Sequence, residues 1–229
     1  KAAPDAVTLP QYFKTHGYHS AGMGKIFHVG HGNKNDKASW SVPFWRSNVV
    51  SYALPESRAK KGLTREEALF SNVPGQQAKK LPRGAAYEAA DVDDSAYPDG
   101  RIADEAIRRL KSYSETPEQP FFLAVGFVKP HLPFCAPKKY WDIYDRSKFE
   151  LAKYQSSPIG APDFAPTSWG DLRQSRGMPQ TGSVPQEEQR ALIHGYHAAV
   201  SYMDAQIGRV IDALDESGLA KNTIIVVWG

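Results

Sequence analysis

The sequence is poor in cysteine and contains no long apolar run. Its single cysteine, Cys135, cannot form an internal disulfide, so the redox compartment stays open. No window approaches the roughly 20 apolar residues that cross a bilayer, which predicts that the chain has no membrane span. The first nine residues, KAAPDAVTL, lack the basic and apolar regions of a signal peptide.

Several common functional patterns are also absent. The formal net charge is only +3, and no basic run is interleaved with aromatic residues, which argues against nucleic-acid binding. The chain has no GxSxG elbow, no P-loop and no dinucleotide fingerprint. Nothing around Cys135 looks like a Cys–His active site, so we interpret it as a small buried hydrophobe.

Two patterns with metal-binding residue types are too incomplete to predict a metal site. His194 and His197 lie three residues apart on a predicted helix, but no third ligand accompanies them, so a solvated helix face is favoured. Asp91, Asp93 and Asp94 in DVDDS lack the glycine and the closing glutamate of an EF-hand, which favours a solvated loop or a cap.

What is present is an alternation of helix and strand signals. Apolar spacing and caps predict helices at about 9–17, 98–113 and 187–217, with Thr8 and Asp99 as caps and Gly218 just past the last end. Apolar runs of strand length stand at about 18–24, 120–128 and 223–229, and the last two read as buried strands. The order predicts an α/β fold with a mostly parallel sheet flanked by helices.

The long helix is expected to bury one apolar stripe. The stripe consists of Leu192, Tyr196, Val200, Met203, Ile207, Val210 and Leu214. Between the regular elements, about 33–97 and 136–186 show no sustained period and are predicted to be irregular insertions.

Polar residues follow two of the predicted strands. The first strand leads into GMGKIFH, with Lys25 and His28, and the second leads into VKPHLPF, with Lys129 and His131. Lysine is a compact cation suited to a sulfate or phosphate oxygen, and histidine can exchange a proton near neutral pH. Because ligands of α/β sheets bind beyond the carboxyl ends of strands, these residues suggest an oxyanion pocket. Taken alone, they also fit ordinary loop residues.

The order of several segments resembles the sulfatase family, and most closely its iduronate-2-sulfatase-like branch. The matching segments are TLPQYFKTHGY, GMGKIFHVG, PDGRIADEAIRRL, PFFLAVGFVKPHLPF and YHAAVSYMDAQIGRVIDALDESGLAKNTIIVVWG. The resemblance implies an alkaline-phosphatase-like α/β fold, of which residues 1–229 would be an internal segment, a partial domain. It also implies that Lys25 and His28 contact sulfate, that His131 binds sulfate and assists the leaving group, and that Lys129 supports substrate binding from beside it.

The sequence departs from the family where the cofactors are concerned. Sulfatases form a formylglycine nucleophile from a C/S-x-P-x-R motif and hold a divalent cation, usually calcium, with aspartate pairs. Neither feature occurs in this chain, and Cys135 stands in CAPKK, where Lys139 replaces the required arginine. We therefore expect the nucleophile and all metal ligands to lie outside these residues, and the segment alone to be inactive.

The resemblance implies that the complete protein is a sulfuric ester hydrolase acting on a sulfated sugar, as in glycosaminoglycan degradation. An exported or lysosomal location is expected with it. Two alternatives stay open: a phosphodiesterase or phosphonate hydrolase of the same superfamily, and a non-catalytic relative that binds anionic glycans. The sugar and the oligomeric state are not predicted.

Overall fold

The computed structural model describes residues 5–27, 35–47, 51–70, 73, 75–165 and 170–229. Its helices are α1 (Leu9–Thr15), α2 (Arg65–Phe70), α3 (Gly75–Ala78), α4 (Pro98–Ser114), α5 (Lys138–Trp141) and α6 (Gln186–Glu216). Its strands are β1 (His19–Gly24), β2 (Tyr87–Ala90), β3 (Phe121–Gly126) and β4 (Phe134–Pro137). Among the described residues, no helix is long and apolar enough to cross a membrane.

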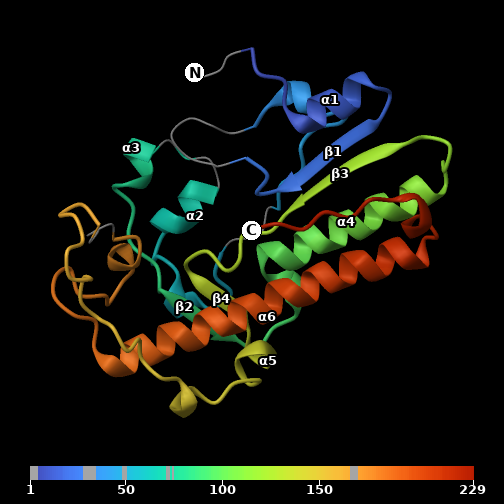
Figure 1. The fold of residues 1–229 in the computed structure, drawn as a ribbon. Coiled ribbons are helices and arrows are strands. Elements are labelled where there is room, and N and C mark those ends of the chain that lie inside the picture. The colour runs from blue at the N-terminus through green and yellow to red at the C-terminus, as the bar shows by residue number, and fades with distance from the viewer. Residues whose placement is uncertain (1–4, 28–34, 48–50, 71–72, 74, 166–169) are drawn as a thin grey trace.

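The strands form two parallel pairs, which confirms the α/β expectation. β1 pairs with β3 so that His19 lies opposite Phe121 and Gly24 lies opposite Gly126. β2 pairs with β4, with Tyr87 opposite Phe134. Figure 1 shows α4 and α6 side by side and running in the same direction, on one side of the β1–β3 pair.

Local signals predicted two helix boundaries well. The Thr8 side chain accepts the N–H of Gln11 at 3.3 Å and begins α1, with Pro10 in its first turn. Gly218 adopts φ +74° immediately after the Ser217 cap of α6. A left-handed residue at this position closes the helix, so this prediction is confirmed.

The predicted cap of α4 is wrong. Tyr97, with extended backbone, is the N-cap residue, and Asp99 lies inside the first turn with only 1% of its surface exposed. The Asp99 carboxylate is used elsewhere, by a loop distant in sequence, so it does not cap its own helix.

The predicted stripe of α6 is wrong in its middle. Tyr196 is 47% exposed, and Val200, Met203 and Ile207 are only half-buried. The buried face instead contains Ala191, Leu192, His194, Gly195, Ala198, Ala199, Tyr202, Gln206, Ala213 and Leu214. Small side chains bring the helix close to its neighbours, and polar groups on this face find partners there, so apolarity alone selected the wrong face.

The predicted insertions contain short local elements. β2 falls within 33–97, and β4 and α5 overlap the start of 136–186. These elements are only four residues long, too short to produce a recognisable period. β3 is parallel as expected, but most of its side chains are half-buried rather than buried.

The predicted buried strand at 223–229 is also contradicted. No strand is present there, and the exposed fractions of Ile224 and Trp228 are 90% and 78%. None of the described strands pairs with this segment, so its apolar side chains stay at the surface.

Asp94 joins α4, α5 and α6. Asp91 and Asp93 of DVDDS are exposed and Asp93 is the N-cap residue of a 3-10 helix, as expected for a solvated loop or a cap, whereas Asp94 is half-buried. Its carboxylate forms an ion pair with Lys139 at 2.7 Å and accepts hydrogen bonds from Tyr140 and Gln206. Its carbonyl accepts the hydroxyl hydrogen of fully buried Tyr202 at 2.9 Å. The same hydroxyl accepts the N–H of Gly100 at 2.7 Å, which satisfies a backbone donor in the first turn of α4.

We expect Tyr202→Phe to lower the free energy of unfolding by about 1–3 kcal/mol, because it strands the buried Gly100 N–H and removes the donor to Asp94. Urea unfolding of the complete protein followed by circular dichroism measures this. Tyr196→Phe on the exposed face of α6 is the matched control and should change the midpoint little. Equal midpoints for the two variants would contradict the assignment.

Candidate functional site

The carboxyl ends of β1 and β3 lie directly beside each other. The register ends with Gly24 opposite Gly126, and the N–H of Lys25 donates to the Gly126 carbonyl at 2.7 Å. The loops that start at Lys25 and at Phe127 therefore leave the same edge of the sheet. This is the juxtaposition expected for an oxyanion pocket.

Two glycines make this close approach possible. Gly24 has φ +73°, and a Cβ on it would lie 1.9 Å from the Gly126 carbonyl oxygen. A Cβ on Gly126 would lie 2.4 Å from the carbonyl carbon of Lys25. Any side chain at either position would separate the strand ends and displace the Lys25 loop.

Asp99 holds the loop that follows β3. Its two carboxylate oxygens accept the N–H groups of Val128 and Lys129, each at 2.8 Å. Burial raises the pKa of Asp99, while the two hydrogen bonds and the nearby Lys129 and Lys25 charges oppose that rise. From the sequence, Asp99 was predicted to cap its own helix. No local sequence pattern indicates a hydrogen bond to a loop about thirty residues away.

The Lys129 ammonium forms its hydrogen bonds within its own loop. It is 9% exposed, and its ammonium donates to the carbonyls of His131 and Pro133. Burial lowers the pKa of Lys129, whereas the neighbouring Asp99 charge raises it. The ammonium therefore ties the backbone of the loop together and carries positive charge behind His131.

His131 presents an imidazole with a defined tautomer. Its Nδ1 lies 2.6 Å from the Leu132 carbonyl, which can only accept, so Nδ1 carries the hydrogen of the neutral imidazole and Nε2 is the atom that can gain a proton. Desolvation by surrounding atoms lowers the pKa of His131, and the positive charges of Lys25 and Lys129 lower it further. The Leu132 hydrogen bond and Asp171 act in the opposite direction. Because His131 is exposed, solvent screens the electrostatic effects of these neighbours on its pKa.

Lys25 completes the strand-end cluster, by which we mean Lys25, Asp99, Lys129 and His131. Lys25 is half-buried, and desolvation lowers its pKa while Asp99 raises it. Its charge also acts on both Lys129 and His131. Three of the four residues predicted for the site thus share one electrostatic environment. The fourth, His28, lies outside the described residues.

The described residues do not fit the metal or the nucleophile that the resemblance implies. No group of three or more histidine, cysteine or acidic side chains among them could hold a metal ion. His194 is buried, with Nε2 on the Trp141 carbonyl at 2.8 Å and Nδ1 accepting from Arg146, so it is not half of a metal pair. The Cys135 thiol is fully buried, and burial raises its pKa, as expected for a core residue.

A family model described as Sulfatase matches residues 2–229. Mouse iduronate 2-sulfatase is 35% identical over 227 residues, covering 95% of this chain and 38% of that protein. A sulfatase of Formosa agariphila is 33% identical over 235 residues, covering 100% of this chain and 42% of that protein. The chain thus spans about two fifths of the length of these relatives.

A solved structure gives a weaker likeness. A crystal structure of a yidJ sulfatase from Bacteroides fragilis aligns over 96% of this chain and 42% of its own, with 18% identity and a TM-score of 0.45.

We expect Asp99→Asn to lower the free energy of unfolding by about 1–3 kcal/mol, because an amide has one acceptor oxygen and leaves one of the two loop N–H groups without a partner. It also removes the anion beside buried Lys129. The urea midpoint of the complete protein measures this change. Asp212→Asn, at an exposed position on α6, is the control. A midpoint for the Asp99 variant equal to that of the control would show that the loop does not depend on this carboxylate.

Proposed function

The chain belongs to the sulfatase family, and from this we propose that the complete protein is a sulfuric ester hydrolase that removes sulfate from a sulfated sugar. The observation that carries the proposal is that Lys25 follows β1 and His131 lies on the loop after its parallel partner β3, near enough for the Lys25 charge to act on His131. In this proposal the chain supplies the cationic wall of the sulfate pocket. His28 would join it from outside the described residues.

Lys25 is proposed to hold the sulfuryl oxygens. Displacement at sulfur increases the charge on these oxygens, and a fixed ammonium in a partly desolvated position stabilises it more strongly than bulk water does. The hydrogen bond from the Lys25 N–H to Gly126 anchors the start of its loop, so the backbone that carries the ammonium is fixed before substrate binds.

His131 is proposed to donate a proton from Nε2 to the departing alkoxide of the sugar. The bond from Nδ1 to Leu132 fixes the plane of the ring, and Lys129 and Asp99 fix the loop that carries it. The nearby cations make the protonated imidazole a stronger acid, which suits a poor leaving group such as a sugar hydroxyl. Lys129 acts here as a positioning residue.

The substrate class is proposed from the relatives. The similarity to mouse iduronate 2-sulfatase favours a sulfated uronic acid unit of a glycan. The calcium ion and the formylglycine of such an enzyme would come from residues outside this chain, and the segment alone would be inactive. An exported or lysosomal location is proposed with this substrate.

A substrate panel tests the proposal. We expect the complete protein to hydrolyse a 2-O-sulfated uronic acid disaccharide and an aryl sulfate faster than an aryl phosphodiester. A faster phosphodiester reaction would assign the protein to phosphodiester or phosphonate hydrolysis instead. Binding of the disaccharide without turnover would favour a non-catalytic glycan-binding protein.

We expect His131→Gln to reduce kcat for the sugar sulfate by about 10²–10⁴-fold and for an aryl sulfate much less, since a phenolate leaves without a proton. His131 must be protonated to act, and its pKa is lowered, so kcat of the wild type should fall as pH rises through a value below about 6.5. The variant should lose this dependence. His16→Gln is the control, because exposed His16 also places Nδ1 on a backbone carbonyl, at 2.8 Å. If kcat of the His131 variant still falls with rising pH as kcat of the wild type does, His131 is not the acid.

A further inference from the structure

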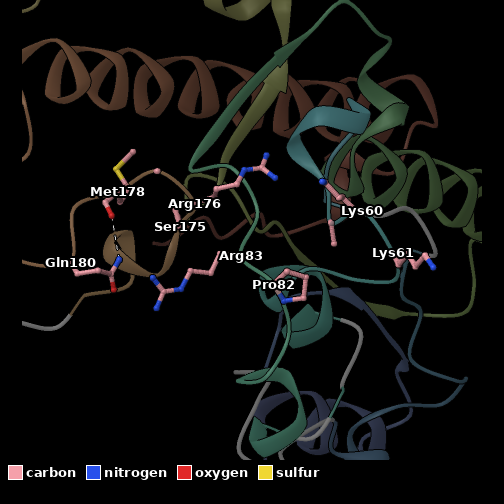
Figure 2. A pocket seen from close by; sticks show the side chains of 10 residues that line it. Lys60, Lys61, Pro82, Arg83, Ser175, Arg176, Met178 and Gln180 are labelled. Carbon is pink, nitrogen blue, oxygen red and sulfur yellow. Dashed lines mark hydrogen bonds between the residues drawn. The ribbon is translucent and has the colours of Figure 1, made fainter.

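A basic hollow lies apart from the strand-end cluster. Its volume is about 540 Å³, within the range of roughly 300–1,000 Å³ found for ligand sites. Three segments line it: 59–61, 82–83 and 175–178 together with Gln180. We call this cavity the basic hollow because four cationic side chains line it: Lys60, Lys61, Arg83 and Arg176. In Figure 2, Gln180 and Met178 lie on one side of the hollow, and Lys60 and Lys61 lie on the opposite side.

The charge of the basic hollow is only partly compensated. Among the described residues that line it there is no carboxylate, and none of its four cations forms an ion pair in the described part of the chain. Glu66, which accepts the Gly84 N–H, interacts electrostatically with Arg83 and offsets part of one charge. An excess of positive charge remains, and it favours an anionic ligand.

The two arginines of the hollow are held by the backbone. Arg83 donates to the Arg173 carbonyl at 2.8 Å. Arg176 donates to the carbonyls of Arg58 and Glu56. These bonds fix the position of both guanidinium groups without neutralising them. Lys60 and Lys61 are exposed, and their ammonium groups have no hydrogen-bond partner among the described residues. The hollow thus combines two fixed cations with two adaptable ones.

One short segment links the basic hollow to His131. Asp171 is near enough to His131 to affect its pKa electrostatically. The 3-10 helix Leu172–Gln174 follows, and its Arg173 carbonyl is the acceptor of Arg83. Arg176 and Gln180, on the same segment, line the hollow. The segment from Asp171 to Gln180 therefore reaches from the surroundings of His131 to the hollow.

We propose that the basic hollow is a subsite for the anionic groups of a glycan chain whose sulfated terminal unit occupies the strand-end cluster. The inference rests on the proposed function and adds a requirement for a polyanionic chain rather than an isolated sugar. The charged ends in Figure 2 lie apart instead of meeting at one point, which suits several anionic groups along a chain better than one small anion.

The test uses the complete protein with Lys60→Gln and Lys61→Gln combined. Both side chains are exposed, so the fold should be kept. The probe is a fluorescent heparin-derived hexasaccharide, and its Kd is measured by anisotropy. We expect Kd to rise about threefold to tenfold at about 50 mM salt and the difference to shrink at high salt, as screening predicts. The control combines Lys111→Gln and Lys221→Gln. These substitutions remove the same charge at exposed positions, within the last turn of α4 and shortly after the end of α6.

A Kd equal to that of the wild type, or an equal rise in the control, overturns the subsite. A turnover measurement separates this inference from the proposed function. If the hollow is a subsite, KM for the hexasaccharide rises with Kd, while kcat and the kinetics on an aryl sulfate stay the same. A rise in Kd without a rise in KM also overturns it. If no sulfate ester is hydrolysed at all, the proposed function fails, and Kd still decides whether the hollow binds the glycan chain.

Discussion

The bond between the Asp99 carboxylate and the N–H groups of Val128 and Lys129 is the contact on which the site depends. It joins the start of α4 to the loop after β3, and β3 is paired with β1 up to Gly24. The Lys25 loop is therefore fixed relative to the His131 loop without a direct hydrogen bond between the two side chains in the described part of the chain. A charged acceptor suits this task because hydrogen bonds to ionised groups are stronger than neutral ones.

Burying that carboxylate also sets the charge of the site. An isolated buried anion is costly, and Lys129 beside it, itself buried, offsets part of the cost. Lys129 in turn satisfies its ammonium on two carbonyls of the loop. With Lys25 included, the strand-end cluster contains two cations and one anion before His131 is protonated. The same interactions that make the loop rigid thus leave a net positive charge at the edge of the sheet.

The sequence allowed prediction of the elements that local chemistry determines. Thr8 and Gly218 mark helix ends through their own backbone conformation or side chain, and the alternation of strands and helices indicated parallel pairing. The placement of Lys25 and His131 after the ends of two strands was predicted from the order of the elements, and those strands are paired. Long-range bonds could not be predicted: Asp99 has the residue type of a cap but serves a distant loop, and Tyr202 is buried because its hydroxyl joins Asp94 to Gly100. The expectation of a buried strand at 223–229 failed because burial requires a neighbour, and none of the described strands provides one.

The residues proposed for chemistry and those proposed for substrate preference lie in different kinds of structure in this chain. Lys25 directly follows paired strand β1, and His131 lies on the loop after β3 that Asp99 holds. The basic hollow is built from segments without strands and is held mainly by arginine bonds to carbonyls. Such segments tolerate substitution better than strands do, because few backbone bonds depend on them. Under the proposed function, substitutions at residues such as Lys60 and Lys61 would change the length and charge of the preferred glycan and leave the geometry around the sulfate fixed.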